Sequence, residues 1–600
     1  MKQLYLAIIS VCFLLPAQAQ QTAKKDSASV NREMTLEKEY NPTIQDAAKL
    51  NQLPELREPQ PPKSKVEFSN YAVPYEVQSG LTYLKPKAYL SDLDYSKYRG
   101  YLTAGVSTLV DVNADLGYQI LNSGKDHLGI FASHRSSNSK LTNLQIDEKQ
   151  KFKINDTWGG LNFQHDFETV KLNLDAKYTY SDFNYSGLSN NYLKILSSST
   201  YPPPYDYGYE INTYPNQANN LFEAHAGISS DEANKTNYKV NATYTLFKQK
   251  YGATVDETGE KENRILFDWD FHKNFNSTMG SGFAGFFKNY SYSSIQDDSN
   301  ITGNSNYSAL SLNPYFYLEG DNLDLFVGGK VDVEFGGRKK VVGAPTIRFN
   351  YYPSDQFLFY LMADGGRKDN SRYNSFYENR YTHPWFRLWD SRTPLDGTAG
   401  IKFLPLRNFS VNIFGGYKIT MDEHFFVPFW GLDTHTLYGT ASDAYFADAH
   451  TIKAGGNIKY TFQDIFEIDL KGVYYKWDIK SDDESSSDYQ QAWSKPNFVT
   501  DLNMAYRIAS VPLKFNLMYH GEFGRKTSVP VINPLYSTIS LPEIVDMKNI
   551  HDLSLKATYS INKYFSTYLS TNNLLFRKYD IWYGYPAQNF NIMAGINVLF

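Results

Sequence analysis

The sequence has almost no cysteine, since Cys12 is the only one among 600 residues. Cys12 lies in an apolar stretch, residues 4–15, that follows Lys2 and precedes a small-x-small tripeptide at 17–19. This order is typical of a secretory signal peptide, here residues 1–19. We therefore predict an exported mature chain whose stability depends on no disulfide bond.

Long apolar runs and blocks of one charge are also missing. Beyond the signal peptide, no run reaches the roughly 20 residues that a membrane-spanning helix needs. There are 59 Lys and Arg against 64 Asp and Glu, with no basic block, so nucleic acid is not an expected partner. The motifs HExxH and GxSxG are absent and the 11 His are scattered. We therefore predict no enzyme activity, no cofactor and no metal site.

Aromatic residues are abundant, with 49 Tyr, 39 Phe and 8 Trp despite a mean hydropathy of −0.48. From about Tyr101 onward, stretches of about ten residues alternate between apolar and polar. In VKLNLDAKYTY (170–180), the Val, Leu, Ala and Tyr residues occupy one face of a strand, and the Lys, Asn, Asp and Thr residues occupy the other. Strands of about 9–11 residues with one apolar face are typical of transmembrane β-barrels.

Connector lengths distinguish a membrane barrel from a soluble β-sandwich or propeller. The connectors after even-numbered strands are short, whereas those after odd-numbered strands are often long, for example 136–151, 184–219, 368–396, 422–449 and 526–548. Outer-membrane barrels have short periplasmic turns and long extracellular loops in this way. We therefore predict an all-β fold over residues 96–600, a transmembrane antiparallel β-barrel of about 22 strands with both termini in the periplasm.

The chain ends on the stretch NIMAGINVLF, in which Phe600, Val598 and Ile596 share an apolar face and Asn597 lies on the other. A strand edge cannot remain unpaired in lipid, so this strand must close the barrel against the strand near Tyr101. Its terminal aromatic residue resembles the signal that the outer-membrane assembly machinery reads. That machinery and outer-membrane lipid are therefore expected partners.

The residues before this strand, NNLLFRKYDIWYGYP, resemble the closing hairpin of TonB-dependent receptors. Asn573, Leu574 and Tyr579 match the strand end of that hairpin, residues 582–586 match its aromatic loop, and Phe600 matches its aromatic terminus. The resemblance extends to the whole barrel, because those receptors have 22 strands. It implies the outer membrane of a Gram-negative cell, and the abundance of Tyr and Asn is similar to that of Bacteroidetes proteins.

Residues 20–95 depart from that family. They are polar, rich in proline toward their end, and too few for the plug domain that the family carries inside its barrel. We expect a periplasmic arm that is flexible or partly inserted in the lumen. Within it, Met34, Thr35 and Leu36 are weakly similar to a TonB box, the segment that pairs with TonB. The alternative is an ordinary extended linker.

Aromatic residues in the outer loops are candidate contacts for a ligand or a protein partner, because exposed Tyr and Trp often anchor binding sites. The candidates are Tyr205, Tyr207, Tyr209, Tyr377, Trp385, Trp389, Phe426, Trp430 and Trp582. The alternative is that these residues belong to the interfacial aromatic girdle or pack the loops on themselves.

Ionisable residues of both signs are expected on the lumen face, which favours a wetted lumen over a charge-selective filter. They are Lys171, Asp175, Lys177, Lys239, Asp268, Asp270, Glu467, Asp469, Lys471 and Lys514. The leading hypothesis is porin-like transport, in which the barrel passes or receives a solute at the outer membrane. The alternative is a structural or scaffold subunit whose lumen is filled by its loops, its arm or a partner protein. TonB and a surface lipoprotein that caps the barrel are the candidate protein partners.

Overall fold

The computed structural model describes residues 98–600, apart from 146, 186–209, 213–215, 231–235, 253–257, 294, 298–299, 303, 339, 385, 407, 430–431, 434–435, 439–440, 464, 481–489 and 534–537. The predicted signal peptide, the arm at 20–95 and Met34, Thr35 and Leu36 lie outside the described residues. So do five of the aromatic candidates: Tyr205, Tyr207, Tyr209, Trp385 and Trp430. No helix in the described part of the chain is long and apolar enough to cross a membrane.

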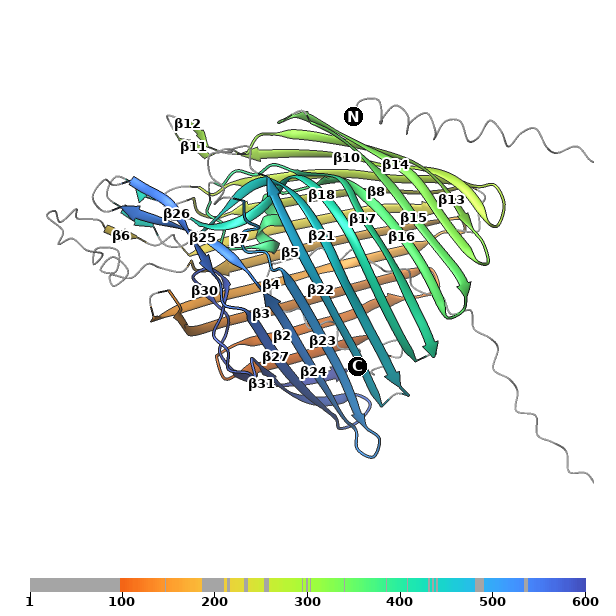
Figure 1. The fold of residues 1–600 in the computed structure, drawn as a ribbon. Helices are drawn as coiled ribbons and strands as arrows, with labels where there is room; N and C mark the ends of the chain where they lie inside the picture. Colours follow the sequence, from red (N-terminus) through yellow and green to blue (C-terminus); the bar gives the residue numbers. More distant parts are fainter. Residues whose placement is uncertain are drawn as a thin grey trace, which may run out of the picture. The chain divides into compact units, whose positions relative to one another are not determined.

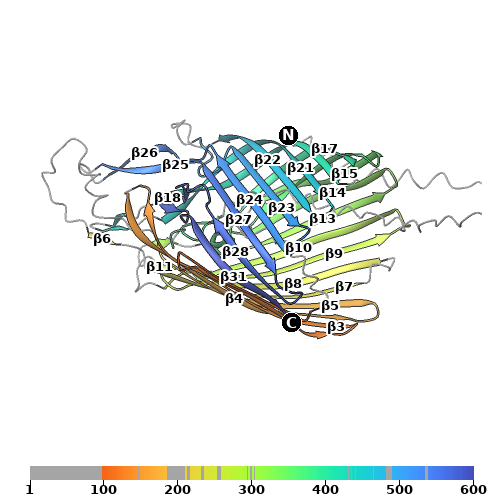
Figure 2. The same cartoon turned by 90° about the horizontal axis from the view of Figure 1, so that it is seen from below.

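Within these residues, 22 antiparallel strands form one closed sheet (Figures 1 and 2). Each strand pairs with the next one along the chain, and the last strand pairs with the first. In order, the strands are β1 (Gly100–Ser107), β2 (Val112–Asn122), β3 (Asp126–Asn143), β4 (Glu148–Asp166), β5 (Val170–Phe183), β7 (Gln217–Ser230), β8 (Thr236–Gln249), β9 (Lys261–Asn274), β10 (Met279–Ser293), β13 (Tyr307–Glu319), β14 (Leu323–Gly336), β15 (Val341–Ser354), β16 (Phe357–Lys368), β17 (Ser391–Leu406), β18 (Phe409–Phe429), β21 (Ala441–Phe462), β22 (Phe466–Lys480), β23 (Phe498–Ile508), β24 (Leu513–Phe523), β27 (Ile550–Ser560), β28 (Phe565–Asn572) and β31 (Asn591–Leu599). The predicted all-β barrel is confirmed.

Side chains alternate across the barrel wall as the sequence predicts. On β5, Leu174 and Tyr178 are exposed on the outer face, whereas Phe183 packs inward against Phe376. Asp175 shares the inward face with Phe183, because an even number of positions separates them in a strand. Large apolar side chains are exposed on strands all around the sheet. A soluble monomer avoids such a surface, whereas a lipid-facing wall requires it.

The seam between β1 and β31 closes the barrel as predicted. Tyr101 lies opposite Leu599, and the backbone N–H of Gly100 donates to the carbonyl oxygen of Phe600 at 2.8 Å. The Phe600 ring stacks on Tyr118, with 6.0 Å between ring centroids. A Cβ atom at Gly100 would lie 2.5 Å from this ring, so glycine allows the terminal aromatic residue to lie across the seam.

The two ends of the barrel differ in their connectors. At one end the connectors are short, such as 167–169, 320–322 and 355–356, and at the other end long ones occur, such as 369–390 and 524–549. This alternation confirms the predicted difference in connector length between the two ends. Both the first and the last strand reach the short-turn end, where Tyr101 and Leu599 pair.

Two of the predicted loops are wrong, because most of their residues continue the strands. The predicted loop at 136–151 is a hairpin in which β3 and β4 stay paired up to Asn143 and Glu148. The predicted loop at 422–449 is mostly the outer part of β18 and β21, which pair up to Phe429 and Ala441. The sequence HFFVPF lacks strict alternation because this part of β18 is buried on more than one side, including by a loop that folds into the barrel.

A short helix and smaller strands lie at the long-loop end (Figure 1). They are the helix α3 (Arg372–Glu378), the hairpins β11 (Ile295–Asp297) with β12 (Asn300–Thr302), β25 (Lys526–Asn533) with β26 (Thr538–Asp546), and β29 (Asp580–Trp582) with β30 (Tyr585–Pro586), and a three-stranded sheet of β6 (Glu210–Asn212), β19 (Leu432–Asp433) and β20 (Thr436–Tyr438). This end therefore carries most of the structure outside the barrel wall.

Candidate functional site: a segment that spans the lumen

Residues 369–390, which connect β16 to β17, fold back between the barrel walls at the long-loop end; we call them the lumen segment. They include α3, whose N-cap Ser371 accepts a hydrogen bond from the backbone N–H of Asn374. A helix of seven residues is too short to be stable by itself. Its position, visible among the strands in Figure 1, therefore depends on contacts with the walls.

Buried and half-buried ion pairs join the lumen segment to the first wall, β4 to β9. The Arg372 guanidinium donates to Glu260, just before β9, and the Arg372 backbone N–H donates to Glu262 at 2.6 Å. Arg380 makes a bidentate pair with Asp156 of β4, at 3.0 and 2.9 Å. Charge-assisted bonds in surroundings that largely exclude water are strong and directional, so they fix the orientation of the segment.

The lumen segment also contacts the opposite wall. The Glu378 carboxylate, at the end of α3, lies 2.6 Å from Nε2 of His424 on β18 and 3.1 Å from Nζ of Lys495, before β23. The backbone N–H of Ser442 on β21 donates to the carbonyl oxygen of Tyr381 at 2.8 Å. Since β4 is the fourth and β18 the fifteenth strand of the 22 in the ring, the segment joins strands half a circuit apart.

Two aromatic clusters fill the space around these ion pairs. In the first, Phe376 of α3 packs with Phe183, Leu221 and Phe247 of the wall, and Tyr377 packs against this cluster. In the second, Phe386 of the lumen segment packs with residues from the wall and the last long loop, namely Leu141, Phe152, Phe426, Trp582 and Tyr585. Tyr381 stacks on Tyr585, with ring centroids 3.7 Å apart. The segment is thus held by apolar packing as well as by charge.

Four of the aromatic candidates from the sequence fall within the described residues. Phe426 and Trp582 are buried, with 1% and 5% of their surface exposed, and Tyr377 borders the first cluster. Trp389 stacks on Phe446 at 4.1 Å between centroids. All four support the position of the lumen segment, and contact with a ligand or partner stays a prediction for them.

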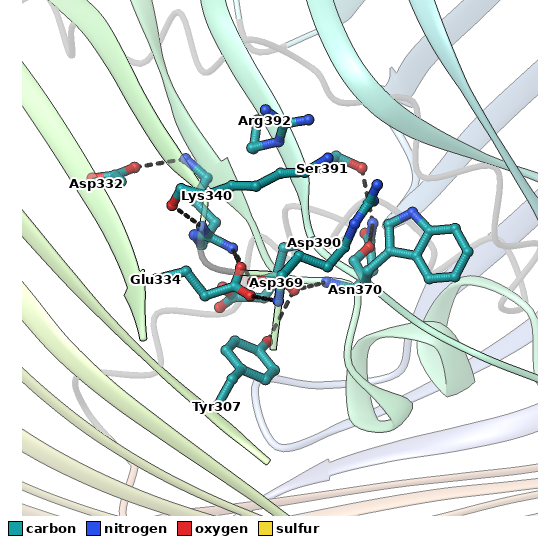
Figure 3. Close-up of polar contacts among 12 residues, drawn as sticks. Tyr307, Asp332, Glu334, Lys340, Asp369, Asn370, Asp390, Ser391 and Arg392 are labelled. Carbon is teal, nitrogen blue, oxygen red and sulfur yellow. Dashed lines mark hydrogen bonds and ion pairs between the residues drawn. The ribbon is translucent and has the colours of Figure 1, made fainter. Parts of the chain in front are cut away.

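The two ends of the lumen segment meet in a clasp around Asp390 (Figure 3). The Asp390 carboxylate accepts hydrogen bonds from the Tyr307 hydroxyl at 2.9 Å, from the Asn370 backbone N–H at 3.2 Å and from the Arg367 guanidinium at 3.2 Å. The Asn370 amide in turn donates to the Ser391 hydroxyl at 2.8 Å. The clasp ties the first and last residues of the segment to each other and to β13 and β16.

Two carboxyl groups of the clasp differ in their pKa. Burial, together with the negative charge of Asp369, raises the pKa of Asp390 to about 7. Burial acts in the same direction on Asp369, but the Lys288 ammonium, 2.6 Å away, outweighs it and lowers the pKa of Asp369. Asp390 therefore exchanges a proton near neutral pH, whereas Asp369 stays ionised.

Sequence reasoning identified 368–396 as an aromatic loop but missed its charged anchors. Arg372 and Glu260 are separated by 112 positions, and Arg380 and Asp156 by 224, so no local pattern links them. The signal that was present is the concentration of large aromatic side chains between charged ones in YNSFYENRYTHPWFRLWD, residues 373–390, which is too apolar for a loop in water. Within the described residues, no group of three or more His, Cys, Asp or Glu side chains could hold a metal ion.

The sequence matches no family model and no curated protein. Solved structures are similar in fold. The ferripyoverdine receptor of the outer membrane of Pseudomonas aeruginosa is 13% identical, with 84% of this chain and 72% of that chain covered and a TM-score of 0.58. The siderophore receptor PirA from Acinetobacter baumannii is 11% identical, with coverages of 84% and 80% and a TM-score of 0.58. The FrpB iron transporter from Neisseria meningitidis is 10% identical, with coverages of 84% and 81% and a TM-score of 0.59.

At these identities the likeness concerns the fold. The chain resembles TonB-dependent receptors in its 22-stranded barrel, as the residues of its closing hairpin predict. The incomplete plug and the likeness to Bacteroidetes proteins stay predictions.

Proposed function

We propose that the protein is an outer-membrane barrel that receives a solute at its long-loop end and passes it through the lumen when the lumen segment withdraws. The single observation that carries this proposal is the lumen segment itself, which connects opposite walls of a wide polar barrel. With the long-loop end facing the outside of the cell, the short turns and both termini are periplasmic. The similar structures, which are described as receptors and transporters of siderophores, iron or copper, support transport and not catalysis.

A polar lumen wall supports the passage of a hydrated solute. Inward-facing charges pair with partners of the wall, as in Lys453 with Asp396 at 2.8 Å and Asp175 with His225 at 3.1 Å. Such pairs rigidify the wall and keep it wetted without selecting one sign of charge. Barrels of 22 strands are wide enough to need a plug, and the lumen segment is the element of the described chain that takes this place.

The attachment of the lumen segment suits a gate that opens. Ion pairs can exchange their protein partners for water or for a ligand, whereas the wall is held by a continuous backbone ladder that cannot open in lipid. Withdrawal of the segment would therefore leave the barrel closed in its circumference and open along its axis. We further propose that the segment around Met34, Thr35 and Leu36 contacts TonB, that a surface lipoprotein caps the long-loop end, and that the strand ending at Phe600 is read by the assembly machinery.

Conductance in planar lipid bilayers tests the gate. The full-length protein should conduct weakly, and a variant in which a Gly-Ser linker replaces residues 371–389 should conduct strongly and let oligosaccharides swell liposomes. Replacement of the hairpin β11–β12 by a linker is the matched control and should conduct as weakly as the parent. If the 371–389 variant forms a heat-modifiable barrel but stays as sealed as the control, gated transport through the lumen is wrong.

The scaffold function remains the second candidate, because a lumen occupied by the chain's own segment also suits a subunit that transports nothing. Crosslinking in native membranes followed by purification separates the two. A scaffold should be recovered in a stoichiometric complex, with bilayers sealed for both the parent and the 371–389 variant. Recovery of the barrel alone counts against a scaffold.

A further inference from the structure

A cavity of about 190 Å³ opens beside the outer part of β22, away from the clasp. β22 pairs with β23 only up to Tyr474, so its last residues leave one edge to residues 490–497 and 524–526. The cavity is lined by Lys476, Trp477, Gln491, Lys495, Asn497 and Lys526, together with Gln490 and with small and aromatic neighbours. Pockets that bury a whole drug-sized ligand have roughly 300–1,000 Å³. This cavity therefore suits one charged group or one small ring.

The described part of the lining is positive. Within the described residues, three lysines line the cavity and no carboxylate does. Lys476 is exposed and Lys526 is half-buried, and neither forms an ion pair with a described residue. Gln491 and Asn497 add amide donors, and the Trp477 indole N–H donates to the carbonyl oxygen of Pro496 at 3.2 Å, which fixes the ring in the wall. Lysines and amide side chains among the lining residues, together with an aromatic ring, suit an anionic organic group.

Lys495 connects this cavity to the lumen segment. Its ammonium lies 3.1 Å from the Glu378 carboxylate, which is the attachment of α3 to the second wall. Lys495 is 7% exposed, so its charge is poorly solvated by water and depends on the groups around it. An anion in the cavity would therefore compete with Glu378 for the same ammonium.

We propose that this cavity binds a small organic anion, bearing a carboxylate, sulfate or phosphate group, and that the bound anion loosens the lumen segment by drawing Lys495 away from Glu378. The binding step stands by itself, whereas its consequence rests on the proposed gating function. By linkage, the anion binds more tightly when the segment is released, because anion binding and release both favour the state in which Lys495 has left Glu378. Glu378 keeps His424 as a partner, so the anion weakens one attachment and leaves the others in place.

Calorimetry on the full-length protein in nanodiscs tests the binding step. Glucuronate, glucose 6-sulfate and glucose 6-phosphate are the anionic probes, which distinguish the three anionic groups, and glucose is the neutral control. At least one anion should bind while glucose does not, and Lys526→Gln should weaken that binding at least tenfold. Lys125→Gln, in the turn between β2 and β3, removes the same charge far from the cavity and should change nothing. Absence of binding, equal binding of glucose, or equal affinity of the two variants would overturn the site.

Hydrogen exchange of residues 369–390 tests the coupling. The bound anion should accelerate exchange in α3 severalfold, and Lys495→Gln should show accelerated exchange without the anion and no further response to it. Lys125→Gln should behave as the parent. An anion that binds in a Lys526-dependent way but leaves exchange in α3 unchanged would refute the coupling. The conductance of the 371–389 variant does not depend on the cavity, so failure of the coupling and failure of gated transport are distinguishable.

Discussion

The barrel wall and the lumen segment are built from opposite kinds of interaction. In the wall, neighbouring strands exchange backbone hydrogen bonds in register, as from Asp126↔His165 to Asn143↔Glu148 along β3 and β4. In the lumen segment, a single short helix is held by side chains whose partners come from both walls. Side-chain attachments can be broken one at a time, whereas a ladder in lipid cannot.

This difference separates assembly from function. The wall can be closed and stable whether or not the lumen segment is attached, because every strand of the sheet pairs with both of its neighbours, and the segment adds backbone bonds at Ser442, at the outer end of β21. The segment in turn can change its attachment without unfolding the protein. Experiments that damage one region should therefore leave the other intact, and those that damage both would show that the comparison is wrong.

The largest effect is expected for Arg372→Met. Its partner Glu260 is 1% exposed and would be left as a buried charge without its cation, a loss that costs about 3–5 kcal/mol. The lumen segment should detach, so bilayer conductance should rise and exchange in α3 should accelerate. In gel electrophoresis, the temperature at which the barrel loses the fast migration of its folded form should stay near that of the parent. A barrel that no longer assembles would show that the segment supports the wall.

A charge placed on the lipid face of the wall should have the next largest effect. Leu174→Arg puts a guanidinium on the exposed outer face of β5, which costs about 2–4 kcal/mol near the membrane midplane. Asn173→Arg, one position earlier, places the same group on the lumen face and should be nearly neutral. Unfolding by urea in lipid vesicles measures both. Equal losses would show that the two faces of β5 are assigned wrongly.

The wall could be predicted from the sequence because its pattern is local. Whether Leu174 points to lipid and Asp175 to the lumen follows from alternation with a period of two, and the strand number follows from repetition of that pattern. The closing contact between Gly100 and Phe600 could be predicted from topology alone, since lipid forbids an open edge.

The attachment of the lumen segment could not be predicted in the same way. Arg372, Arg380 and Glu378 lie in a long loop, where charged residues are ordinarily solvated, and their partners are strands far away in the sequence. The sequence shows which residues the loop contains, but it does not show that the loop folds into the lumen. The outer part of β18 was missed for a related reason, because burial on more than one side, including by the segment, removes the alternation on which strand prediction depends.

The clasp predicts a dependence on pH. Because the pKa of Asp390 is raised to about 7 when the segment is attached, protonation of Asp390 favours attachment at low pH. That contribution is present in full below the ordinary carboxyl pKa and is lost as the pH rises through about 7. Exchange in residues 369–390 should therefore accelerate severalfold between pH 6 and pH 8.

Asp390→Asn isolates this contribution, because it keeps the shape of the side chain without its titration. Arg367, Tyr307, Asn370 and Asp369 act on the carboxyl group, Lys288 pairs with Asp369, and all five are unchanged in the variant. The difference in exchange between the parent and the variant should be small at pH 6 and large at pH 8. A difference that is constant across this range would show that Asp390 does not take up the proton.

The smallest effect is expected for Arg338→Gln, which removes an exposed ion pair at the rim. It can be compared with the buried pair of Arg372 and Glu260. Arg338 is 42% exposed and lies 2.7 Å from Asp422, which keeps Arg392 and Lys340 as partners. Its guanidinium also lies over the Trp389 ring, 5.1 Å from the centroid, a contact that is weak at an exposed site. Exposed pairs contribute about 0–1 kcal/mol, because water solvates both groups when the pair is lost. Conductance and exchange in α3 should therefore stay at the parental values. Arg372→Met is expected to open the lumen. If Arg338→Gln opened it as well, the attachment of the segment would depend on the number of ion pairs and not on the burial of Glu260.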